Sequence, residues 1–179
     1  MKKIILHFVL LFFSCSNLSA TKIARVTINE LYNDAEIVAF VNVVSAITSN
    51  SDCGIVYEVE VIEPFKNTKI NSRMKIYNTY NNPVGIRAGQ KFIIFTNISN
   101  NKNCSETNLE VGHAGYAALW VGSPYLIDFD IAVKIPKSFI VPPLTLKTQD
   151  GRTSNEEISE IVWADKNKFI AYLRNISKN

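Results

Sequence analysis

Short segments in which apolar and polar residues alternate recur along most of the chain, and such a period of two is typical of β-strands. The clearest example is IVYEVEVI at residues 55–62, which is apolar throughout on one face and carries charges in the middle of the other. Turn-forming residues separate these segments, and this spacing favours a mainly β barrel or sandwich over alternating βαβ units. We expect strands at residues 36–47, 55–62, 73–78, 91–96, 116–121 and 126–135.

Residues 36–47, EIVAFVNVVSAI, are apolar on both faces and rich in β-branched side chains, which predicts a central strand. In the following strand, Glu58 and Glu60 share a face, and we interpret them as a solvated strand face rather than as a catalytic pair. Pro64 has no N–H to donate to a neighbouring strand, so we expect it to end that strand.

Two capping boxes predict helices near the ends of the chain. Thr27 and Glu30 open a short helix that ends at residues 33–34. Ser154 and Glu157 open a longer amphipathic helix, which we expect to pack on the barrel. Its apolar side would carry Ile158, Ile161, Val162, Phe169, Ile170 and Leu173.

The first twenty residues have the layout of a secretory signal peptide. Lys2 and Lys3 precede an apolar run at residues 4–13, and small residues at 18–20 offer a cleavage site. The apolar run is too short to span a bilayer, which takes about 20 residues. We therefore expect an exported chain, periplasmic or extracellular, whose residues 21–179 form a single β-barrel domain with a C-terminal helical extension and no transmembrane segment.

Removing the signal peptide changes the charge argument. The whole chain has a formal charge of +3, and loss of Lys2 and Lys3 lowers it to +1. A nearly neutral domain has no basic stripe to follow a phosphate backbone, which argues against a nucleic-acid partner.

Two of the three cysteines, Cys53 and Cys104, lie beyond the signal peptide. In an oxidising compartment, they are most simply a disulfide; the alternative is a pair of free buried thiols. A metal site is less favoured, because the exported chain adds only His113 to these ligands, and we expect no cofactor.

The third cysteine, Cys15, offers an alternative to cleavage after Ala20. With Ser14 before it, Cys15 resembles a lipoprotein cleavage site, although Phe12 and Phe13 are bulkier than that pattern requires. Lipidation there would tether the protein to a membrane by its N-terminus.

Residues that could carry catalysis are few. His113 lies between glycines in a loop, where a general base could sit, but the chain has no GxSxG motif. Asp128 and Asp130 would share one face of a strand and could shift each other's pKa or hold a cation. We favour ordinary structural roles for all three residues.

The order of three motifs resembles that of exported bacterial proteins with a netrin-like domain, which is also the domain of tissue inhibitors of metalloproteinases. The motifs are DAEIVAFVNVV at residues 34–44, YEVEVIEPFKN at 57–67 and AGQKFIIFT at 88–96. The resemblance covers about residues 27–110, and it implies a five-stranded OB-type barrel with flanking helices.

The resemblance also implies a protein-binding function, with one departure. The animal inhibitors grip the catalytic zinc through an N-terminal cysteine, whereas cleavage after Ala20 leaves Thr21 first. Lipidation of Cys15 would block the amine that this mechanism needs. The inhibitory mechanism therefore does not carry over to this chain.

We predict a non-catalytic binding module of the cell envelope that recognises a protein or an envelope component. The barrel face or the loops at residues 78–89 and 97–115 would form the contact. An exported hydrolase that uses His113 or the Asp128/Asp130 pair is the alternative, and a protease inhibitor is a third possibility.

Overall fold

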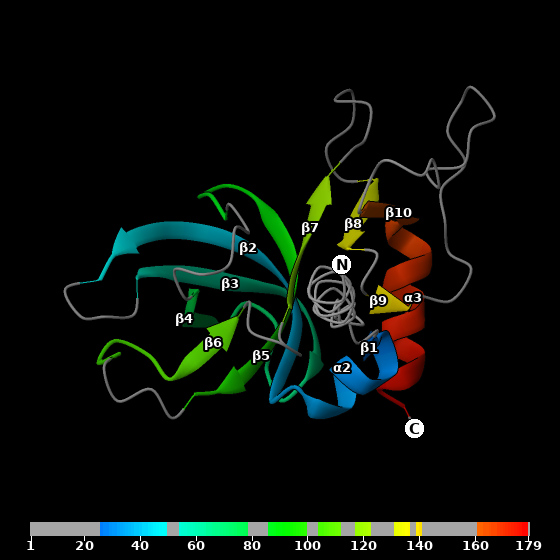
Figure 1. The fold of residues 1–179 in the computed structure, drawn as a ribbon, viewed down its shortest axis with the longest axis horizontal. Helices are drawn as coiled ribbons and strands as arrows, with labels where there is room; N and C mark the ends of the chain where they lie inside the picture. Colours follow the sequence, from blue (N-terminus) through cyan, green and yellow to red (C-terminus); the bar gives the residue numbers. More distant parts are fainter. Residues whose placement is uncertain are drawn as a thin grey trace, which may run out of the picture.

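A computed structural model gives the fold (Figure 1). It describes residues 26–49, 54–78, 86–99, 104–111, 117–122, 131–136, 139–140 and 161–178.

Five strands close into a barrel, the fold that the resemblance to netrin-like domains implies. They are β2 (Ile37–Thr48), β3 (Ile55–Lys66), β4 (Arg73–Asn78), β5 (Lys91–Ile98) and β6 (Leu109–Val111). β2 lies between β3 and β5, β3 pairs with β4, and β6 joins β4 in parallel and β5 antiparallel. This closed order, with one short N-terminal and one C-terminal helix, is that of an OB-type barrel.

The fifth barrel strand is not the one expected from the sequence. We predicted a loop at residues 97–115, but β6 lies within it and closes the barrel. With only three residues, this strand shows too little alternation to be recognised beside the Asn-rich residues before it.

Three further strands extend the sheet beyond the barrel. β7 (Ala117–Gly122) pairs with residues 91–95 of β5, while residues 97–98 of the same β5 edge pair with β6. β8 (Ala132–Pro136) then pairs with β7, and β10 (Ile161–Asp165) pairs with β8, both antiparallel. A separate parallel pair joins β1 (Val26–Thr27) to β9 (Phe139–Ile140). We refer to β7, β8 and β10 as the sheet extension.

β2, β5 and β7 are apolar on both faces because each face packs in a different core. On β5, Phe92 and Ile94 point into the barrel, whereas Ile93 and Phe95 join a second core with the two helices. β2 and β7 alternate in the same way. The prediction of a central strand at residues 36–47 is therefore confirmed.

The N-terminal helix α2 (Ile28–Asp34) begins with the predicted capping box. The Thr27 hydroxyl accepts a hydrogen bond from the Glu30 N–H at 3.1 Å, and the Glu30 carboxylate accepts one from the Thr27 N–H at 2.8 Å. Leu31 and Tyr32 bury the inner face of this helix in the second core.

The C-terminal helix starts later than we predicted. Residues 161–165 form β10, and α3 (Lys166–Ile176) begins after Asp165, whose carboxylate accepts the Lys168 N–H at 2.9 Å. Pairing with β8 holds residues 161–165 extended, despite their partial fit to the helical pattern. The expected apolar side is confirmed for Phe169, Ile170 and Leu173, whereas Ser154 and Glu157 lie outside the described residues.

Pro64 does not end its strand, contrary to the prediction. β3 continues to Lys66, and its register with β2 shifts between the Ala39–Pro64 and Val38–Lys66 pairs, leaving Phe65 as an extra residue. A bulge interrupts the ladder, so a proline there loses little hydrogen bonding. Phe65 uses the bulge to bury its ring in the second core.

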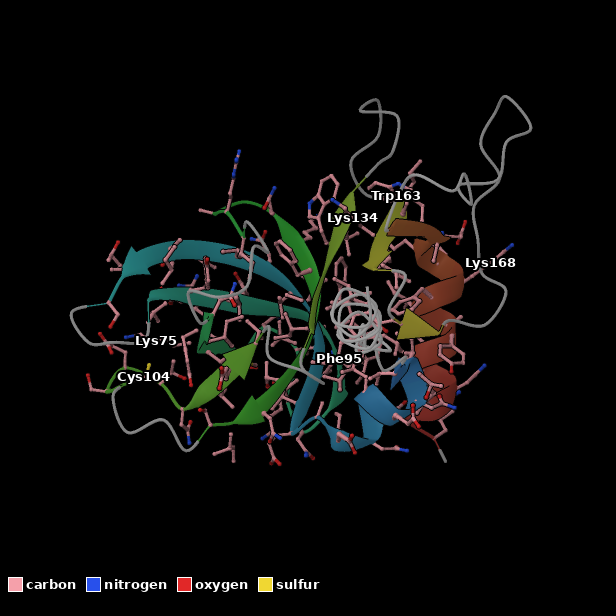
Figure 2. All side chains as sticks on the ribbon, viewed as in Figure 1. Lys75, Phe95, Cys104, Lys134, Trp163 and Lys168 are labelled. Carbon is pink, nitrogen blue, oxygen red and sulfur yellow. The ribbon has the colours of Figure 1, made fainter. Side chains whose placement is uncertain are left out.

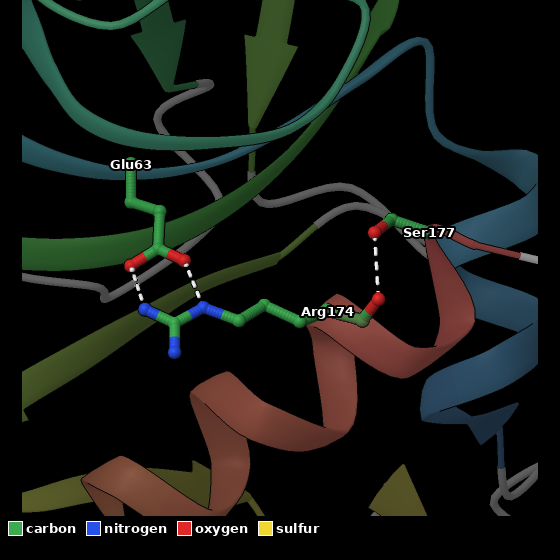
Figure 3. A network of polar contacts seen from close by, with 3 residues as sticks. All are labelled: Glu63, Arg174 and Ser177. Atoms are coloured by element: carbon green, nitrogen blue, oxygen red, sulfur yellow. Dashed lines mark hydrogen bonds and ion pairs between the residues drawn. The ribbon is translucent and has the colours of Figure 1, made fainter.

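α3 is fastened to the barrel by polar contacts outside the second core. Arg174 donates from Nε to Glu63 Oε1 at 2.6 Å and from Nη2 to Glu63 Oε2 at 3.0 Å (Figure 3). The Glu63 carboxylate raises the pKa of the Arg174 guanidinium through this hydrogen-bonded pair. Tyr172 donates to Asn29 Oδ1 at 2.7 Å, which joins α3 to α2. Among the described residues, neither helix has the length and apolar character needed to cross a membrane.

Candidate functional site

Most of the residues singled out from the sequence lie outside the described residues: Cys15, Cys53, His113, Asp128 and Asp130. Their predicted roles therefore stay predictions. Cys104 is described and buried, but its pairing with Cys53 also stays a prediction.

Cys104 packs with Val56 and Tyr77 in a small cluster on the outer side of the barrel. The Ser49 hydroxyl donates to Glu106 at 2.7 Å, so the chain after β2 lies beside the chain that contains Cys104. Residue 53 is one position before Gly54, whose carbonyl accepts the Ser49 N–H at 2.9 Å. Cys53 itself lies outside the described residues, so the disulfide between Cys53 and Cys104 stays a prediction.

The two glutamates of β3 form a charged outer face, as we predicted. Arg73 lies 3.6 Å from Glu58 and 3.8 Å from Glu60, whose side chains are 35% and 38% exposed. Lys75 stands opposite Glu58 in the register of β3 and β4. We call Glu58, Glu60, Arg73 and Lys75 the barrel wall, and its charges largely balance one another.

The face of the second and third strands of an OB-type barrel is a common ligand site. Here these strands are β3 and β4, and the chain itself covers part of their outer face. Thr107 donates to the Lys75 carbonyl at 2.7 Å, and the Tyr77 hydroxyl donates to the buried Glu110 carboxylate at 3.1 Å. Residues 104–110 thus take up room that a ligand would use.

Among the described residues, the barrel interior is filled mainly by hydrophobic side chains from all five strands. Tyr57 is the bulkiest polar residue among them, and burial raises the pKa of its phenol. In the described part of the chain, no three His, Cys, Asp or Glu side chains come together as a metal site.

The sheet extension carries the most distinctive surface feature. Trp120 on β7 and Trp163 on β10 meet edge to face, with ring centroids 5.7 Å apart and an angle of 66° between the rings. They are the two tryptophans of the chain, and both are half-buried. Such an edge-to-face pair is stabilised by the quadrupoles of the two rings, and Trp120 also packs against the barrel core.

Gly122 allows Trp120 to lie close to the sheet. A Cβ atom built at Gly122 would lie 2.4 Å from Cζ2 of the Trp120 ring, which is closer than atoms in contact can approach. The indole therefore rests across the backbone of Gly122, two residues further along the same face of β7. A larger residue there would push the ring away.

Lys134 completes this surface. It is the direct cross-strand partner of Trp163 in the antiparallel pair of β8 and β10, and Figure 2 shows the two labelled side by side. The neighbours of Lys134 on β8, Val133 and Ile135, point the opposite way into the second core. We call Trp120, Trp163 and Lys134 the tryptophan face.

The tryptophan face was not predicted from the sequence, because Trp163 was expected to lie in a helix. The available signal was weak: the chain has two tryptophans, and Trp120 precedes a glycine by two residues. Without the pairing of β8 with both β7 and β10, nothing brings the rings together.

Comparison with known proteins identifies no relative of this chain. No protein-family model, curated protein or solved structure matches this chain. The resemblance to netrin-like domains stays a prediction, and the OB-type barrel rests on the strand order alone.

Proposed function

We propose that this protein is an exported, non-catalytic binding module of the bacterial cell envelope, and that its tryptophan face contacts a protein or an envelope component. The observation that carries the proposal is the half-buried pair of Trp120 and Trp163 beside Lys134. Tryptophan is among the residues most enriched at binding hot spots, because one ring contributes a large contact area at a low cost in side-chain entropy.

The position of these rings supports binding. Both belong to paired strands rather than to loops, and the core on the reverse of the sheet holds β7 and β8 in place. A site on a rigid element loses little conformational freedom when it binds, so more of its contact energy remains for affinity.

The proposal places the module outside the cytoplasm, in the periplasm or at the cell surface. The signal-peptide layout of residues 1–20 supports export, and the expected pair of Cys53 and Cys104 suits an oxidising compartment. Lipidation of Cys15 would in addition hold the module at a membrane.

Sedimentation with bacterial envelopes tests the proposal. The wild-type protein should sediment with envelopes, whereas Trp163→Ala should weaken that association by about 2 kcal/mol. Arg73→Gln on the barrel wall is the matched control and should sediment like the wild type. Circular dichroism of each variant establishes that it is folded.

Two results would contradict the proposal. One is a wild-type protein that stays in the supernatant, and the other is a folded Trp163→Ala variant that sediments as well as the wild type. Release of soluble products from the envelopes, abolished by His113→Ala or by changing Asp128 and Asp130, would instead favour the hydrolase alternative.

A further inference from the structure

The tryptophan face combines three properties that together define a ligand class. It presents aromatic rings, it carries a cation beside them, and its described part is small. Each property excludes some partners, and the proposed function leaves the choice between them open.

The rings favour a ligand with a flat face of polarised C–H groups. The face of an indole is the negative part of its quadrupole, so it attracts groups with partial positive charge. A sugar ring presents such C–H groups on one face, with its hydroxyls at the edge. The close approach of Trp120 to the backbone of Gly122 fixes the orientation of one ring before any ligand arrives.

The cation favours an anionic group on that ligand. Lys134 stands directly opposite Trp163, so a carboxylate on a sugar stacked against Trp163 would lie within reach of its ammonium group. Asp165, two residues beyond Trp163 on β10, accepts the backbone N–H of Lys168 through one oxygen as the cap of α3. A lysine contributes to such a contact as a point charge.

The described part of the tryptophan face is small for a protein partner. A stable protein–protein interface buries about 800 Å² on each side, whereas a whole aromatic side chain buries about 150–250 Å². Both tryptophans are already half-buried, so the described face offers only a part of what a protein needs. One or two sugar rings need a far smaller contact area.

Single-stranded nucleic acid also stacks on aromatic rings, but it needs a positively charged groove along its backbone. The tryptophan face supplies one described lysine, and the exported chain is nearly neutral. We propose that the tryptophan face binds an oligosaccharide that carries carboxylate groups, with a sugar ring on Trp163 and a carboxylate on Lys134. This inference rests on the proposed function and names its ligand class.

Intrinsic fluorescence can test it directly, because both tryptophans of the chain belong to this face. The exported chain is titrated with trigalacturonic acid, with the uncharged maltotriose and with oligothymidylate. Trigalacturonic acid should change the emission and reach saturation. Lys134→Gln should weaken its binding by about fivefold, and added salt should do the same. Trp163→Phe should weaken it by about tenfold.

Lys75→Gln, on the barrel wall, is the matched control and should bind like the wild type. The inference is overturned if trigalacturonic acid causes no saturable change, if Lys134→Gln binds as tightly as the wild type, or if oligothymidylate binds more tightly. If envelope association still depends on Trp163 while trigalacturonic acid does not bind, the ligand class is wrong and the proposed function stands. If neither ligand nor envelope binds, both fail.

Discussion

The ammonium nitrogen of Lys66, at the end of β3, lies 2.6 Å from the carbonyl oxygen of Ala35, just beyond the end of α2. It also donates to the carbonyls of Asn33 at 2.8 Å and Tyr32 at 3.1 Å. Helix ends leave carbonyls without partners and carry partial negative charge, so one lysine satisfies three acceptors and opposes the helix dipole. Lys66 thereby couples the short N-terminal helix to the barrel.

Replacing Lys66 with methionine should therefore destabilise the protein. We expect a loss of about 1–2 kcal/mol in the free energy of unfolding, measured by urea denaturation. Lys69→Met, in the exposed turn between β3 and β4, is the matched control and should change it by less than about 0.5 kcal/mol. Equal effects of the two substitutions would show that Lys66 does not stabilise the helix end.

The capping box predicts a pH dependence. Hydrogen bonds from the Thr27 N–H, and then from its hydroxyl, lower the pKa of Glu30 below its ordinary value of 4.5. A lowered folded-state pKa means that the folded state favours the charged form. The contribution of Glu30 is therefore complete above pH 4.5 and is lost as the pH falls through the lower folded-state pKa.

Comparing the wild type with Glu30→Gln checks this sign. The stability difference between the two proteins should be constant near neutral pH and should shrink as the pH falls below about 4.5, as measured by thermal unfolding. A difference that grows on acidification would contradict the assignment.

Gly122→Ala should move the Trp120 ring. Its new Cβ would meet the indole at 2.4 Å, so the ring must shift, and we expect a loss of about 1–3 kcal/mol in stability together with a changed tryptophan emission. Gly89→Ala is an informative control. Its φ of +82° also strains an alanine, but no atom lies within 4 Å of the new Cβ. It should lower stability and leave the emission unchanged, and equal emission in all three proteins would refute the account of Gly122.

Cys53→Ser tests the expected disulfide. If Cys53 and Cys104 are bonded, the substitution should lower the free energy of unfolding by about 2–5 kcal/mol under oxidising conditions. Cys104→Ser should have an effect of similar size, and a reductant should remove most of the difference between wild type and variant. An unchanged melting temperature for Cys53→Ser under oxidising conditions would refute the bridge.

Local interactions explain what the sequence could predict. The capping box joins residues three positions apart, so its pattern is visible in any window of the chain. The long strands β2, β3 and β5 repeat the period of two several times. β2 is apolar on both faces because each face packs in a different core. These features are enough for the barrel class.

The features that were missed depend on partners distant in the chain. β6 is recognisable only from its pairing with β4 and β5, and β10 only from its pairing with β8. Pro64 is tolerated because the register shift against β2 places it at a bulge. The tryptophan face requires the pairing of β8 with strands on both sides, which a single sequence does not reveal.

Acrylamide quenching of tryptophan emission, in the presence and absence of bacterial envelopes, tests the central claim most directly. Because both tryptophans lie in the tryptophan face, quenching reports the accessibility of that surface alone. We predict that bound protein is quenched less than free protein. Protein that sediments with envelopes and is quenched as strongly as free protein would contradict the claim, because binding would then use another face.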